Sequence, residues 1–162
     1  MSEYRSVGRW TFLNPPEAIA RVTPRAMKAA WKRVGVYWHR KMMPRHFDAG
    51  AGNVYKYQPR SNDYMRRKQR RWGHRRPLWW TGAMKQKVSA APRVTSTAKY
   101  AKVALRGPRY LYMYRRDYNQ PDKAAELTRT IQREQAELRD ILERRVKQRF
   151  EGLRIVKRAR SK

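Results

Sequence analysis

One stretch of the chain combines a dense group of basic side chains with interleaved aromatic residues. The basic residues are Arg60, Arg66, Arg67, Lys68, Arg70, Arg71, Arg75 and Arg76. The aromatic residues among and beside them are Tyr57, Tyr64, Trp72, Trp79 and Trp80. Basic side chains neutralise phosphates and release counterions, and aromatic rings stack on exposed bases. The pattern therefore predicts one of two roles. The segment binds nucleic acid, or its aromatic rings lie in the core while its basic side chains contact acidic neighbours in an oligomer. The residue types alone favour neither.

The sequence contains no recognisable catalytic motif. It has no G-x-S-x-G, no phosphate-binding P-loop and no G-x-G-x-x-G. Most acidic residues lie after residue 116, where they are expected to pair with basic residues along a helix surface. Phosphoryl chemistry would need clustered carboxylates for metal ions, and the most basic region has none. We therefore expect no enzyme, no catalytic residue and no cofactor.

The histidines do not form a metal-binding pattern. They are His39, His46 and His74, and the chain has no cysteine. A zinc site needs three or four ligands at defined spacing, and no thiolate or paired carboxylate accompanies these imidazoles. The sequence thus predicts no metal site and no disulfide.

The charge of the chain restricts its surroundings. Its 162 residues carry a formal net charge of +29, and no Asp or Glu lies between Tyr64 and Arg116. The repulsion among these positive charges is severe in the folded chain unless a polyanion or acidic neighbouring subunits offset it. The hydrophobic content of 40% is too high for a disordered basic tail. No apolar run is long enough for a membrane span and no secretory signal is visible, so we expect no membrane partner.

The apolar spacing predicts the elements that position these residues. Residues 1–13 are expected to be an N-terminal arm. Helix starts are expected at Asn14–Glu17 and again at Thr23-Pro24, and apolar residues then recur at helical spacing from Met27 to Met42. Pro44 is expected to end this helix near Met43.

The rest of the chain is expected to be a long basic loop, a sheet and a helix. The loop spans 48–82, with one or two helical turns between Tyr64 and Arg71. A small antiparallel sheet of three or four strands spans 84–116, and a helix spans 120–153, followed by a basic tail at 154–162. A single α+β domain over 14–153 follows from this order. The apolar stripe of the last helix is predicted to be an oligomer interface, formed by Leu127, Ile131, Leu138, Ile141, Leu142 and Val146.

The segment 53–88 resembles a known family. Asn53-Val54-Tyr55-Lys56-Tyr57-Gln58-Pro59-Arg60-Ser61 is followed by Tyr64, Arg67-Lys68, Gly73 and Pro77-Leu78-Trp79-Trp80-Thr81-Gly82-Ala83-Met84. This pattern is similar to that of the tail-completion and virion-morphogenesis proteins of tailed bacteriophages. The residues that carry the family motif are Pro59, Arg60, Ser61, Pro77, Leu78, Thr81 and Gly82.

The resemblance implies an architectural role in the virion. Its implied place is the head–tail junction, after assembly in the host cytoplasm. The implied partners are further copies of the chain in a ring, hexameric in such families, and other virion proteins such as connector or portal-side rings and the tail tube or terminator. The net charge departs from that of a generic ring subunit and suggests additional, non-specific contact with genomic DNA. The alternative is a basic nucleic-acid-binding protein of ribosomal or nucleoid type.

Overall fold

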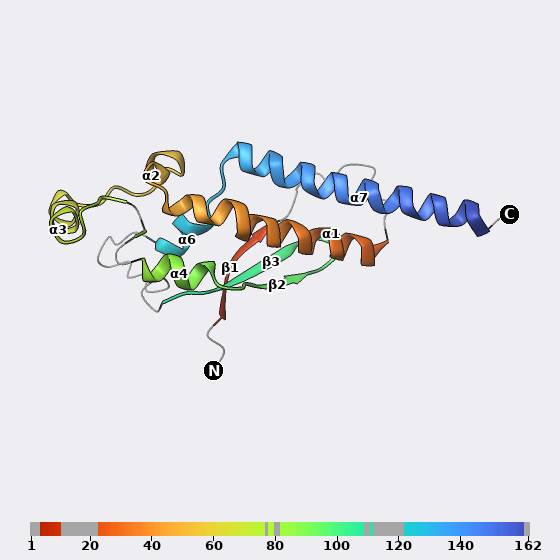
Figure 1. The fold of residues 1–162 in the computed structure, drawn as a ribbon, viewed down its shortest axis with the longest axis horizontal. Helices are drawn as coiled ribbons and strands as arrows, with labels where there is room; N and C mark the ends of the chain where they lie inside the picture. Colours follow the sequence, from red (N-terminus) through yellow and green to blue (C-terminus); the bar gives the residue numbers. More distant parts are fainter. Residues whose placement is uncertain are drawn as a thin grey trace.

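The computed structural model describes residues 4–10, 23–76, 78–79, 82–108, 111 and 122–160. Its architecture is α+β, as the sequence predicts. A three-stranded antiparallel sheet packs against the long helix α1 (Pro24–Tyr37), and the second long helix α7 (Gln132–Arg160) packs on α1 from the other side (Figure 1). Helix α1 is therefore the middle layer. The expected start at Asn14–Glu17 lies outside the described residues.

Helix α1 begins where the sequence predicts, and two further helical segments of different type follow it. The Thr23 hydroxyl caps it by accepting from the amide of Ala26 at 3.3 Å. The α-helix passes into a π-helical segment, η2 (Trp38–Met42), and then a 3-10 helix, η3 (Met43–Phe47). Pro44 lies in the first turn of η3, where its missing N–H breaks no hydrogen bond. The α- and π-helical course therefore ends at Met42, close to the end near Met43 that the sequence predicts, and a 3-10 helix follows it.

The sheet has the strand order β1-β3-β2. Strand β3 (Ala101–Arg106) is central, and its side chains alternate between buried and partly exposed. Strand β2 (Arg93–Ser96) shortly precedes β3 in the sequence and pairs with it on one side. Strand β1 (Tyr4–Trp10) lies far earlier in the sequence and pairs with β3 on the other side, with an irregularity in the register between Ser6 and Gly8. The N-terminal segment is thus partly an edge strand, which corrects the expected arm.

The remainder of the predicted 84–116 sheet needs correction. Residues Ala83–Ser89 form a helix, α4, whose buried residues Met84 and Val88 are four positions apart. That spacing places both side chains on one helix face, which turns toward the core. The last part of the expected sheet, residues 109–116, lies outside the described residues apart from Leu111.

Two helices replace the single helix expected over 120–153. Asp122 caps α6 (Lys123–Thr128) by accepting from the amide of Ala125 at 2.9 Å. The chain leaves the helix at Arg129, whose guanidinium donates to the backbone oxygens of Tyr55 and Lys56. Helix α7 then runs to Arg160, through the positions expected to be a tail.

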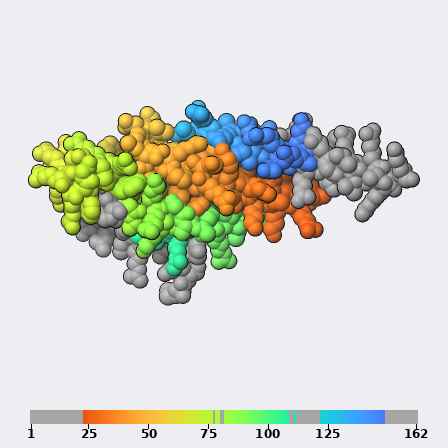
Figure 2. All heavy atoms as spheres, in the orientation of Figure 1, coloured from red at the N-terminus to blue at the C-terminus, as the bar shows by residue number. Residues whose placement is uncertain are grey.

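The expected loop 48–82 contains two further helices. The short α2 (Ala51–Val54) follows η3, and α3 (Asn62–Trp72) is longer than the one or two turns predicted. In Figure 1, α3 lies at one end of the molecule and the C-terminal end of α7 at the other. The space-filling view shows the residues of α3 gathered at that same end (Figure 2). The most basic segment is thus a helix at an extremity of the fold.

Candidate polyanion-binding surface

Local sequence signals at both ends define α3. The Ser61 hydroxyl accepts from the amide of Tyr64 at 3.3 Å, which satisfies one of the unpaired amides of the first turn. Asp63 lies in that first turn, where a negative charge favours the helix dipole. Gly73 ends the helix at a φ of 67°, a left-handed conformation that glycine adopts without strain.

Four basic residues form the exposed side of α3, and we call them the outer arginines. They are Arg66, Arg67, Arg70 and Arg71. Their spacing of one, three and one residues places them along one broad face of a helix. All four are exposed, and no ion pair involving them is present among the described residues. Arg75 and Arg76, just beyond the helix, are exposed as well.

Two members of the predicted polyanion-contact group lie inside the fold instead. The guanidinium of Arg60 pairs with the buried carboxylate of Glu126, where its Nη1 lies 3.0 Å from Oε1, and only 18% of the Arg60 side chain is exposed. Lys68 is only 2% exposed, and its ammonium donates to the backbone oxygen of Arg76. Both residues therefore have contacts within the chain and do not belong to the exposed side of α3.

Glu126 anchors the segment before α3, and the sequence pattern did not single it out. Besides Arg60, its carboxylate accepts from the amide of Gln58 at 3.0 Å. It thereby fixes the segment that leads into α3 to helix α6, 68 positions away in the sequence. Nothing in the local pattern distinguishes Glu126 from the other acidic residues, because its partner is remote.

A second buried carboxylate anchors the segment before α3. Glu134, 1% exposed, accepts from the hydroxyl of Tyr55 at 2.7 Å and pairs with Arg45 at 3.4 Å. The ring of Tyr55 stacks on His46 with centroids 3.8 Å apart, and His46 Nδ1 lies 2.6 Å from the hydroxyl of Tyr57. Together these contacts fix α2 and η3 to the first turn of α7.

Burial controls the protonation of this group. Desolvation lowers the pKa of His46 to about 4, against a smaller opposing effect from the backbone of Glu126. Desolvation also raises the pKa of Tyr55 and of Tyr57, and the carboxylate of Glu134 adds to the rise at Tyr55. The imidazole of His46 and the phenols of Tyr55 and Tyr57 are therefore neutral near pH 7. These three side chains form packing and hydrogen-bond contacts and add no charge to the protein surface.

Each described histidine contacts a different part of the chain. His39 is buried with Nε2 2.8 Å from the backbone oxygen of Val88, and His74 lies edge-on to Trp79 with ring centroids 6.2 Å apart. Among the residues that the structure describes, no group of three or more His, Asp or Glu could hold a metal ion.

The motif residues of 59–82 shape the entry to and exit from α3. Pro59 and Arg60 precede the helix and Ser61 caps it. Leu78 is buried in the core and has a φ of 53°, unusual for a residue with a side chain. Gly82 starts α4 at a φ of 83°. Pro77 and Thr81 lie outside the described residues.

The apolar stripe predicted as an oligomer interface is mainly core. Leu127, Leu138, Leu142 and Val146 are at most 4% exposed and belong to the same buried cluster as α1 and the sheet. Ile131 and Ile141 are half-buried, and Ile141 packs against this cluster. The stripe stabilises the chain itself, because α1 offers an apolar face for α7. It is therefore not a free oligomer interface.

Comparison with known proteins adds no relative to this description. No described helix is both long and apolar enough to cross a membrane. No protein-family model, curated protein or solved structure matches the chain.

Proposed function

We propose that this chain is a structural subunit of a phage head–tail junction, where it forms or joins a ring around the DNA channel. The outer arginines would contact a polyanion there, either genomic DNA in the channel or acidic faces of neighbouring subunits. The observation that carries the proposal is the helix α3 itself. It lies at one end of the molecule and exposes Arg66, Arg67, Arg70 and Arg71, which form no ion pair with any residue that the structure describes.

The surroundings of α3 support a binding role for its charge. Arg60, Glu126 and Glu134 hold the segments beneath the helix, so the outer arginines are not needed to maintain the fold. A preorganised helix also loses less conformational entropy on binding than a mobile loop would. The motif at 53–84, which resembles phage tail-completion proteins, is the segment that builds this helix.

A second candidate function is nucleic-acid binding of ribosomal or nucleoid type. One observation favours it: Trp72 is 37% exposed, and the guanidinium of Arg71 lies 5.5 Å from its ring centroid. An exposed indole beside a cation suits stacking on an unpaired base. This candidate predicts binding without a ring.

The test begins with the native mass of the full chain at low and high salt, with and without a short DNA duplex. A discrete ring supports the junction subunit. A monomer that binds DNA with a steep salt dependence supports the second candidate instead. A chain that stays monomeric and ignores DNA contradicts both.

Charge reversal then tests the surface. The variant carries Arg66→Glu, Arg67→Glu, Arg70→Glu and Arg71→Glu. Its control carries Arg25→Glu, Lys28→Glu, Lys32→Glu and Arg33→Glu, four exposed positions of α1 with the same change in charge. We expect the first variant to lose assembly or DNA binding and to keep its fold, while the control keeps both. Equal losses in the two variants would show a general charge effect and contradict a contact through α3.

A further inference from the structure

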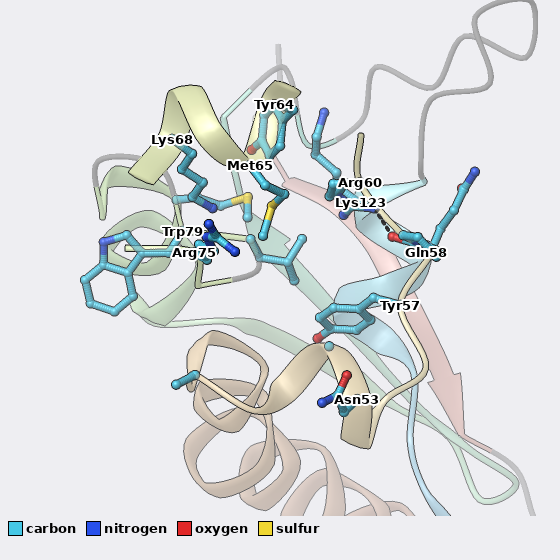
Figure 3. Close-up of a pocket in the computed structure, with 15 residues that line it drawn as sticks. Asn53, Tyr57, Gln58, Arg60, Tyr64, Met65, Lys68, Arg75, Trp79 and Lys123 are labelled. Atoms are coloured by element: carbon cyan, nitrogen blue, oxygen red, sulfur yellow. Dashed lines mark hydrogen bonds between the residues drawn. The ribbon is translucent and has the colours of Figure 1, made fainter. Parts of the chain in front are cut away.

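The face of α3 that points away from the outer arginines borders a pocket of about 390 Å³. Tyr64, Met65 and Lys68 line it from α3, and Trp79 lines it from the segment before α4 (Figure 3). The helix thus separates two environments: an exposed row of arginines and a half-open, partly aromatic pocket.

The pocket has an excess of positive charge. Arg60, Lys68, Arg75 and Lys123 line it from separate segments, and no acidic residue is among its described lining. Glu126, which is not among the described lining residues, pairs with Arg60 and offsets part of the charge repulsion at Lys123. Burial and then the charge of Arg60 lower the pKa of Lys68, to about 8, and of Lys123. The cations therefore repel one another in a partly desolvated site, and a bound anion would relieve this repulsion.

The position of Lys68 suits ligand binding. Its ammonium is held by the backbone oxygen of Arg76, next to Arg75 in the chain, and lies 5.7 Å from the ring centroid of Tyr64. An ammonium has three donors, so the contact with Arg76 leaves capacity for an incoming acceptor. Figure 3 shows Lys68, Arg75 and Trp79 on one side of the pocket and Arg60 with Lys123 on the other.

We propose that this pocket binds the phosphomonoester of a nucleotide-sized ligand. A doubly charged phosphate matches several cations better than a single carboxylate does. The volume is at the lower end of the range for small-molecule sites, and Tyr64 and Met65 provide an aromatic and an apolar wall for a base. The phosphate could come from a free nucleotide or from the end of a nucleic-acid strand. The site is independent of the proposed function, because it does not use the outer arginines.

The test is calorimetric titration of the full chain with four probes: AMP, adenosine, and one oligonucleotide with and without a 5′-phosphate. We expect AMP to bind and adenosine not to bind. A further gain for the phosphorylated over the unphosphorylated strand would identify a strand end as the source. AMP binding without that gain would identify the free nucleotide.

Variants connect the binding to the pocket. Lys68→Met is expected to weaken AMP binding at least tenfold, whereas Lys32→Met, on the exposed side of α1, leaves it unchanged. Lys123→Met provides the same test should the first variant fail to fold. The fourfold variant of the outer arginines is expected to lose DNA binding and to retain AMP binding, which separates this site from the proposed function.

The pH dependence gives a second measurement. Lys68 faces Arg60, Arg75, Lys123, Tyr64 and His74, with Glu126 behind Arg60. Its ammonium loses its proton as the pH rises through about 8, so AMP affinity should fall between pH 7 and 9 in the native chain and less in Lys68→Met. AMP binding that none of the pocket variants alters would overturn the proposal. So would the absence of AMP binding together with pocket-dependent binding of a polyglutamate peptide.

Discussion

At the scale of single residues, the buried pair of Arg60 and Glu126 most directly determines how the basic segment is positioned. Its atoms come from two regions that are 66 positions apart in the sequence. The carboxylate also holds the amide of Gln58. The loss of one partner would leave the other charge buried and uncompensated, which costs far more than the loss of an exposed pair.

We predict that Glu126→Gln lowers the free energy of unfolding by about 3 kcal/mol, because Arg60 then lacks its counter-charge. Urea denaturation of this variant beside Glu143→Gln, an exposed position on α7, measures the difference. A loss below about 1 kcal/mol, typical of surface ion pairs, would show that the contact is not a buried clamp.

His46 gives a prediction on pH. Its pKa is about 4 in the folded chain and ordinarily about 6.5, so the unfolded chain binds the proton more readily. Stability from this residue is complete above pH 6.5 and decreases as the pH falls toward 4, by about 3 kcal/mol in total.

Denaturation midpoints of the native chain and of His46→Gln across that pH range test this expectation. The variant should be less stable at pH 7 but lose less stability on acidification. The slope does not vanish, because burial also lowers the pKa of His39. An identical pH dependence of stability in the two proteins would mean that His46 binds its proton as readily in the folded chain as in the unfolded chain.

At the scale of elements, the packing of α1 on the sheet depends on a glycine. A Cβ at Gly35 would lie 2.9 Å from Val94 Cγ1 and 3.2 Å from Val103 Cγ2. The backbone of α1 therefore approaches β2 and β3 more closely than any side chain would permit. Glycine at this point of a helix is tolerated in spite of its low helix propensity, since it allows this contact.

We predict that Gly35→Ala destabilises the chain by about 1–3 kcal/mol through overpacking, even though alanine favours helices. Gly50→Ala is the matched control, because a Cβ there meets nothing within 4 Å. Thermal unfolding of both variants measures the effect. A rise in the melting temperature of Gly35→Ala would show that helix propensity outweighs the close approach.

The sequence predicted elements best where local signals were complete. Thr23 and the apolar spacing located α1, and the α+β class followed from the order of patterns. Met84 and Val88 already had helical spacing, but the neighbouring β-branched and alternating residues suggested strands. The break between α6 and α7 depends on Arg129, which binds carbonyls more than 70 positions away. Local periodicity contains no information about such a contact.

At the scale of the whole molecule, composition pointed to the candidate surface, and the fold shows which of its residues are exposed. The density of arginine identified the segment, and the exposed row of Arg66, Arg67, Arg70 and Arg71 follows from its helical spacing. The sequence could not separate Arg60 and Lys68 from that row. Their burial depends on Glu126 and on the backbone of Arg76, which only the fold brings close.

The net charge of +29 gives a prediction for the entire chain. We expect the melting temperature to rise between 50 mM and 500 mM salt, because screening weakens the repulsion among the basic side chains. Over this range the Debye length shortens from above about 10 Å toward about 3 Å. The fourfold charge reversal on α3 should reduce this dependence. Calorimetry of both proteins over this range checks it, and a melting temperature that falls with salt would contradict it.

The strand order has a consequence for how the protein is made. Strand β1 (Tyr4–Trp10) leaves the ribosome before its pairing partner β3. That partner lies much later in the sequence, at Ala101–Arg106. Until β3 emerges, strand β1 has no pairing partner in the sheet. Contacts this distant in sequence form slowly, and an unpaired strand is prone to wrong association. Translation must therefore proceed past Arg106 before the sheet can close.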